Sequence, residues 1–72
     1  MTPLQFYRKH DKEHVERMAK KAGTSFGNFK LIALGHGSAS KYLAERLAKA
    51  SKGEMTELEI LYPERYDGKK GK

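Results

Sequence analysis

Residues 19–34, AKKAGTSFGNFKLIAL, decide the fold. Ala19 is followed four positions later by Gly23, and Phe29 and Ile32 come six and nine positions after that glycine. Two helices that cross closely need a small side chain at the crossing, and a tight turn between them favours a glycine because glycine tolerates positive φ. The spacing predicts two helices joined by a tight turn, with residues 20–34 forming the turn and the second helix.

Helix start signals precede this stretch. Residues 2–5, TPLQ, have the pattern of a capping box with proline at the first helical position, and they predict a first helix reaching about His10. Asp11 is typical of the N-cap of a second helix, which ends at Gly23. This second helix has apolar residues at helical spacing on one face, namely Val15, Met18, Ala19 and Ala22.

The helical pattern continues beyond the turn. Ser25 is placed to cap a third helix, which residues 35–37, GHG, terminate. Either Ser38 or Ser40 begins a fourth helix, which closes at Gly53. The residues expected to face inward from these two helices are Phe29, Ile32, Ala33, Leu43, Leu47 and Ala48. Phe26 is expected on the core side, with an apolar contact to DNA as the alternative.

A second capping box, residues 56–59, TELE, opens a short last helix that runs to about Tyr62 and ends at Pro63. A short strand is the alternative there, because Leu58, Ile60 and Tyr62 alternate. The sequence therefore predicts an all-α fold, a compact bundle of about five short helices.

The composition excludes several classes of protein. The 72 residues suffice for one domain, expected over residues 1–66, followed by a disordered basic tail at 67–72. Cysteine is absent, so disulfides and thiolate metal sites are excluded. No apolar run has the length of a membrane span. Because no acid–base pair, activated nucleophile or phosphate loop is visible, we expect no enzyme activity, no cofactor and no small-molecule ligand.

Two of the three histidines, His10 and His14, are four residues apart, a spacing that can hold a metal ion. No third ligand is adjacent in the sequence. We therefore expect two solvated surface histidines and no metal site.

Positive charge is concentrated in the middle of the chain. Residues 20–53 contain seven lysines and arginines against Glu45 alone, which accounts for the whole formal net charge of +6. Residues 22–44 contain no acidic residue at all. A basic surface free of acids favours a polyanion partner, because a carboxylate near phosphates weakens binding. Charge and spacing together favour a DNA-binding helix-turn-helix, with a generic helix bundle as the alternative.

Four segments carry a resemblance to a known family: residues 4–8, LQFYR; 18–25, MAKKAGTS; 32–36, IALGH; and 43–58, LAERLAKASKGEMTEL. Over residues 4–66 the chain resembles the Cro-type and YdaS-type phage and prophage regulators of the lambda-repressor-like superfamily. The resemblance implies a transcriptional repressor that occupies its operator in the cytoplasm of a bacterial cell or phage-infected host. The chain departs from the family at Thr24, where an aliphatic residue is usual, and at Gly27, inside the reading helix.

In this class the N-terminal half of the second helix of the motif enters the major groove of double-stranded DNA. The residues expected to face the bases are Ser25, Gly27, Asn28, Lys30 and Leu31. Asn28 can bond an adenine edge, and Lys30 can donate to guanine or phosphate. The residues expected along the phosphates are Lys20, Lys21, His36, Ser38, Ser40 and Lys41.

The C-terminal segment is more apolar than a small monomer needs, with Leu58, Ile60, Leu61, Tyr62 and Tyr66. We expect a monomer or a weak homodimer that pairs on DNA through this patch. An antitoxin-like module that binds a partner protein through the same patch, and also binds DNA, is the alternative. RNA binding is a third hypothesis, less favoured because no RNA-module signature is present.

Overall fold

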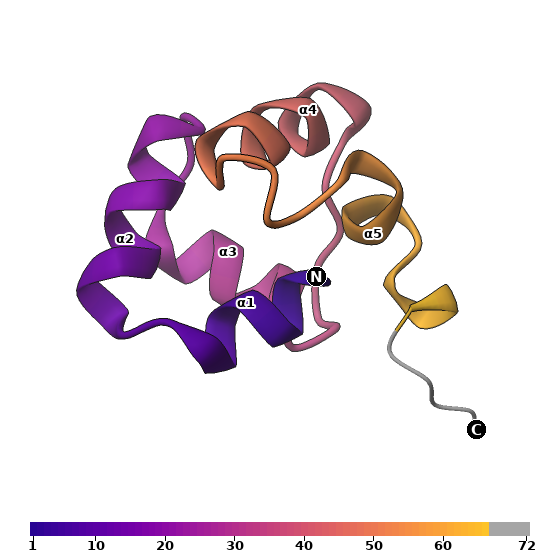
Figure 1. Ribbon diagram of the computed structural model, residues 1–72, viewed down its shortest axis with the longest axis horizontal. Helices are drawn as coiled ribbons and strands as arrows, with labels where there is room; N and C mark the ends of the chain where they lie inside the picture. The colour runs from indigo at the N-terminus through magenta and orange to yellow at the C-terminus, as the bar shows by residue number, and fades with distance from the viewer. Residues whose placement is uncertain (67–72) are drawn as a thin grey trace.

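The computed structural model describes residues 1–66, so the predicted basic tail lies outside the described residues. These residues form helices α1 (Pro3–Lys9), α2 (Lys12–Lys21), α3 (Phe26–Ala33), α4 (Lys41–Ala50) and α5 (Glu57–Leu61), followed by the 3-10 turn η1 (Pro63–Arg65) (Figure 1). Residues 1–66 contain no strand, which confirms the predicted all-α bundle of five short helices. The alternative of a strand near the C-terminus is wrong, because Leu58 and Ile60 lie in α5.

Every helix from α1 to α5 begins at a residue whose side chain caps it. The five N-caps accept a hydrogen bond from the backbone N–H three residues on, and they are Thr2, Asp11, Ser25, Ser40 and Thr56. Both predicted capping boxes are formed, so the Gln5 and Glu59 side chains accept a bond in return from the backbone N–H of their caps. Each such cap contributes about 1 kcal/mol, which matters in helices of this length. Of the two serines that could begin α4, Ser40 does so.

The turn after α2 is built as the sequence predicts. Gly23 has a φ of 83°, and its N–H donates to the carbonyl of Lys20 at 3.0 Å. The N–H of Thr24 donates to the carbonyl of Ala19 at 2.9 Å, which completes a Schellman motif. This closure joins α2 to α3 through a turn of a few residues.

The end of α4 differs from the prediction that Gly53 closes the helix. Lys52 takes the first left-handed position, with a φ of 57°, and Gly53 follows with a φ of 85°. The N–H groups of these two residues bond back to the carbonyls of Lys49 and Ala48. A lysine therefore occupies the backbone position that favours glycine.

The core lies where α3 packs against α1 and α2, and where α4 packs against α2 and α5 (Figure 1). Its largest wholly buried apolar side chains are Phe6, Val15, Phe29, Leu47 and Met55. Phe6 on α1 meets Phe29 on α3 edge to face, with ring centroids 6.1 Å apart. Ala19 is wholly buried as well, which suits the small residue predicted at the helix crossing.

Two parts of the predicted core and surface need correction. Leu43 and Ala48 are only partly buried, whereas Ala44 takes the inner position of α4 beside Leu47. Ile60, predicted in an apolar surface patch, is buried because it belongs to the core cluster that α5 completes. Among the described residues, no helix is long and apolar enough to cross a membrane.

Candidate nucleic-acid interface

Helix α3 exposes one continuous face. Its buried residues are Phe29, Ile32 and Ala33, whereas Gly27, Asn28, Lys30, Leu31 and Leu34 are exposed. At 3.6 residues per turn, these five exposed positions span an arc of about 160° on one side of the helix. The structure therefore brings the predicted base-facing residues of α3 to a single surface, and it adds Leu34 to them.

Asn28 is already held in place on this surface. Its side-chain amide nitrogen donates to the Thr24 hydroxyl at 2.8 Å, and its backbone N–H donates to the capping hydroxyl of Ser25 at 3.1 Å. An amide group has two hydrogens, so one hydrogen and the carbonyl oxygen of Asn28 stay available to a ligand. Thr24 was not predicted as a site residue, because it lies before the N-cap of α3, outside the helix.

Gly27 lies in the first turn of α3 with open space around it. A Cβ added at this position would meet nothing within 4 Å, and the φ of Gly27 is not positive. Neither packing nor backbone conformation therefore requires a glycine here. The residue remains a candidate for close backbone approach by a partner.

Phe26 is half-buried and lies on the core side, as expected. Its ring is tilted against that of Tyr7 on α1, with centroids 6.1 Å apart, and the Lys12 ammonium lies 5.5 Å from its centre. These contacts occupy the ring at the junction of α1, α2 and α3. Phe26 thus packs against the core and is not part of the exposed face of α3.

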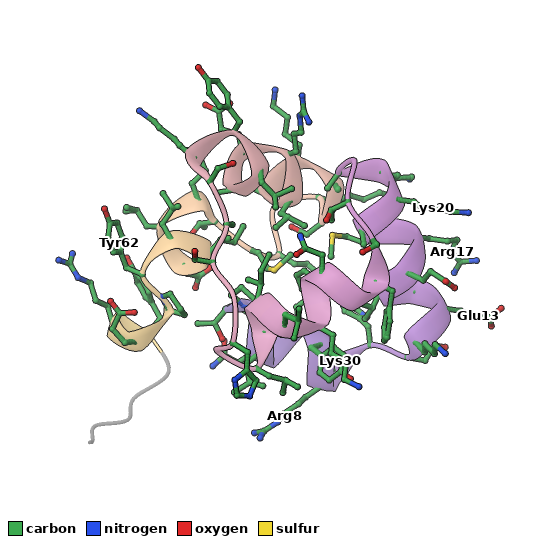
Figure 2. The ribbon with its side chains drawn as sticks, turned by 180° about the vertical axis from the view of Figure 1, so that it is seen from behind. Arg8, Glu13, Arg17, Lys20, Lys30 and Tyr62 are labelled. Atoms are coloured by element: carbon green, nitrogen blue, oxygen red, sulfur yellow. The ribbon has the colours of Figure 1, made fainter. Side chains whose placement is uncertain are left out.

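The residues predicted along the phosphates do not form one cluster with Lys30. Lys20 and Lys21 end α2, His36 and Ser38 lie in the connection after α3, and Ser40 and Lys41 begin α4. All six are exposed. Figure 2 shows Lys30 on the face in front of the core, near Arg8, whereas Lys20 projects from the outer edge of α2 beside Arg17. The predicted phosphate contacts thus come from three separate segments of the chain.

The connection after α3 is tied down by backbone contacts. Gly35 has a φ of 85°, and the N–H of His36 donates to the carbonyl of Leu31 at 2.8 Å. A Cβ added to Gly37 would lie 3.4 Å from the Cβ of Leu31, so the chain passes closely over the end of α3. This contact places the start of the connection at the exposed C-terminal end of the α3 face.

The expectation of two solvated surface histidines is correct for His14, which is exposed, and wrong for His10, whose side chain is only 17% exposed. His10 follows α1 and His14 lies in the first turn of α2, yet their rings stack with centroids 4.0 Å apart. His10 Nε2 lies 2.8 Å from Oε1 of Glu54, in the connection between α4 and α5. The hydrogen bond with His10 lowers the pKa of the Glu54 carboxyl, burial raises it, and the charges of His10 and Lys9 lower it further, so the net shift is downward. Glu54 is 44 residues from His10, which is why local spacing missed it.

The comparisons with known proteins add nothing to this geometry: no family model, no curated protein and no solved structure matches the chain.

Proposed function

We propose that the protein is a sequence-specific DNA-binding regulator that places the exposed face of α3 in the major groove of duplex DNA. The observation that carries this proposal is the composition of that face. It presents an amide, a lysine and apolar contacts over about 160° of α3. It lies within residues 22–44, which contain no acidic side chain. The same helix is joined to α2 by a glycine turn, which supports the helix-turn-helix that we propose.

The chemistry of the face suits base edges. The Asn28 amide can accept from N6 and donate to N7 of adenine, and its second hydrogen keeps the bond to Thr24 that orients it. Lys30 can donate to guanine O6 or N7, or to a phosphate. Leu31, which is 48% exposed, can contact a thymine methyl group.

The surrounding residues suit the DNA backbone. Lys20 and Lys21 end α2, beside the turn that leads into α3, and Lys41 begins α4. From these positions they would meet phosphates of the duplex. Such contacts contribute affinity and salt dependence but little sequence preference. We infer repression by operator occupancy as the mode of action, in keeping with the resemblance to phage and prophage regulators.

Selection of bound sequences from a random duplex pool tests the proposal directly. We expect a defined motif whose preferred bases weaken at one or two positions when Asn28 or Lys30 is replaced by alanine. Removal of a bidentate pair of hydrogen bonds should cost about 1–3 kcal/mol at its own base pair. Lys49→Ala is the matched control, because Lys49 is exposed on α4 and its replacement removes the same charge away from the face.

Two outcomes would reject the assignment. Binding of the best site at unchanged affinity by both Asn28→Ala and Lys30→Ala would remove α3 as the reading helix. Failure to enrich any duplex, together with retention of a structured RNA pool, would replace DNA by RNA as the partner.

A second candidate function is a protein-interaction module, as in antitoxins. It is favoured by the exposure of Leu58, Tyr62 and Tyr66, which are 55%, 44% and 43% exposed. Tyr62 lies at the end of the molecule away from the edge of α2 that carries Lys20 (Figure 2). A partner or a second copy bound there would leave α3 free. Sedimentation with and without the selected DNA tests whether a second copy binds there. We expect the free protein to be a monomer and two copies to bind together on DNA, and a tight dimer in free solution would contradict this expectation.

A further inference from the structure

His10, His14 and Glu54 come together from three separate parts of the chain. His10 caps the end of α1, His14 is in the first turn of α2, and Glu54 follows α4. One ligand atom from each of the three side chains lies within 4.8 Å of the others. We propose that these residues form a binding site for a divalent metal ion of the zinc class.

The donor set suits zinc. Two imidazole nitrogens and one carboxylate oxygen are a common set of three protein ligands for Zn²⁺, with a water molecule in the fourth position. At bond lengths of about 2.0–2.2 Å, a tetrahedral ion needs its ligand atoms about 3.3–3.5 Å apart. His10 Nε2 and Glu54 Oε1 lie 2.8 Å apart. A slight separation of His10 and Glu54, together with a rotation of the His14 side chain, would therefore bring all three atoms into place.

The structure holds two of the ligand atoms, on His10 and Glu54, close together before any ion binds. The His10 ring packs on Phe6 with centroids 4.4 Å apart, and its side chain is only 17% exposed. The His14 ring lies over it, with an angle of 18° between the two planes. An imidazole nitrogen binds a metal ion in the plane of its ring, so the exposed His14 side chain turns out of this stack to share an ion with His10. Because His10 is already ordered, metal binding costs less side-chain entropy than at two free surface histidines.

Neighbouring cations set an upper limit on the affinity. The Lys9 ammonium lies 3.8 Å from Glu54 Oε1, and its side chain is 59% exposed, so it can turn away when a metal ion arrives. Arg17, Lys21 and Lys52 line the adjacent hollow together with His14 and Glu54. With three protein ligands and this positive surrounding, we expect a dissociation constant of about micromolar size, weaker than that of four-ligand structural zinc sites.

Calorimetric titration with zinc chloride near neutral pH tests the site. We expect one equivalent to bind, and binding to weaken by about tenfold or more in His14→Gln and in Glu54→Gln. His36→Gln is the matched control: His36 is exposed after α3 and outside the cluster, so this variant should bind as the wild type does. Circular dichroism of each variant measures whether it keeps its helices.

A measurement on the unmodified protein complements the variants. In proton NMR spectra, zinc should shift the imidazole resonances of His10 and His14 and leave those of His36 in place. The proposal is overturned by the absence of saturable binding, by wild-type affinity in both cluster variants, or by an equal loss of binding in His36→Gln. None of these measurements involves DNA, so the outcome is independent of the proposed regulator function.

Discussion

Replacement of Gly27 by alanine tests the role of the α3 face most directly. Gly27 is in the first turn of the helix, with a φ that is not positive and with no atom within 4 Å of a built Cβ. The new methyl group therefore meets no clash, and the backbone keeps its conformation. Alanine is favoured over glycine in a helix by about 0.5–1 kcal/mol, because it has less conformational freedom to lose on folding. We expect Gly27→Ala to be more stable by this amount.

The gain is large enough to measure. In a domain of 60–100 residues, 1 kcal/mol moves the melting temperature by about 4–8 °C, so thermal unfolding should show a rise of about 2–8 °C. Urea unfolding followed by circular dichroism gives the same difference as a shift of midpoint at constant slope. A variant that melts at or below the wild-type temperature would refute the conclusion that the glycine is not required by the fold.

The same variant separates folding from binding. In the helix-turn-helix that we propose, the N-terminal residues of the reading helix contact the base edges, so the added methyl group should weaken binding to the selected DNA. If the variant is more stable but binds more weakly, its lower affinity comes from the interface and not from unfolding. Unchanged affinity at raised stability would place Gly27 outside the contact surface.

Three further changes follow from the structure. Ser51→Ala should lower stability by about 1–3 kcal/mol, because the buried Ser51 hydroxyl accepts from the N–H of Met55, and this N–H loses its partner in the variant. Urea unfolding measures the loss, and an equally small loss in Ser51→Ala and in the exposed control Ser38→Ala would contradict the prediction. Lys52→Gly should raise stability by about 0.5–1 kcal/mol, since Lys52 has a φ of 57° that glycine adopts without strain. Lys49→Gly, within α4, should lower the melting temperature instead, and a lower melting temperature in both variants would show that Lys52 is not strained. Burial raises the pKa of Glu59, but the Met1 ammonium and Thr56 lower it more, so its net pKa is below the ordinary 4.5. A lowered folded-state pKa means that stabilisation is present above pH 4.5 and is lost as the pH falls through the folded value, so the stability advantage of wild type over Glu59→Gln should shrink as the pH falls below about 4.5. A stability difference that stays constant over this fall in pH would show that the charge of Glu59 contributes nothing.

Local chemistry explains why so much of the fold could be predicted. An N-cap acts on a backbone group about three residues away, and a Schellman turn closes within about six residues, so the roles of Thr2, Ser25 and Gly23 can be inferred from their neighbours in the chain. The exposed face of α3 follows from the same helical period that buries Phe29 and Ile32. These parts needed no knowledge of the tertiary structure.

What the sequence did not show depends on contacts between distant segments. Ile60 is apolar in any arrangement, and only the packing of α5 on α4 decides that it is buried while Leu58 is exposed. The hydrogen bond between His10 and Glu54 joins residues 44 positions apart. The left-handed backbone of Lys52 is a local exception: α4 ends at Ala50 with Ser51 as its C-cap, so the next position, where a left-handed residue is needed, is Lys52 and not Gly53. In the first two cases the deciding contact is tertiary, and no local period reveals it.

Phe6 connects the histidine cluster to α3, the proposed reading helix, and this contact bears on what a bound metal ion would do to the proposed DNA binding. Phe6 contacts the His10 ring on one side and Phe29 of α3 on the other. Because His10 is already packed on Phe6, ion binding changes the position of Phe6 little. Zinc can then act on DNA affinity mainly by raising the folded fraction, since apparent affinity scales with the fraction that is competent to bind. It should leave wild-type affinity unchanged and should restore binding by Ser51→Ala at a temperature where that variant is half unfolded. An equal zinc effect on both proteins would mean that the ion contacts DNA or reshapes α3, which is a different mechanism.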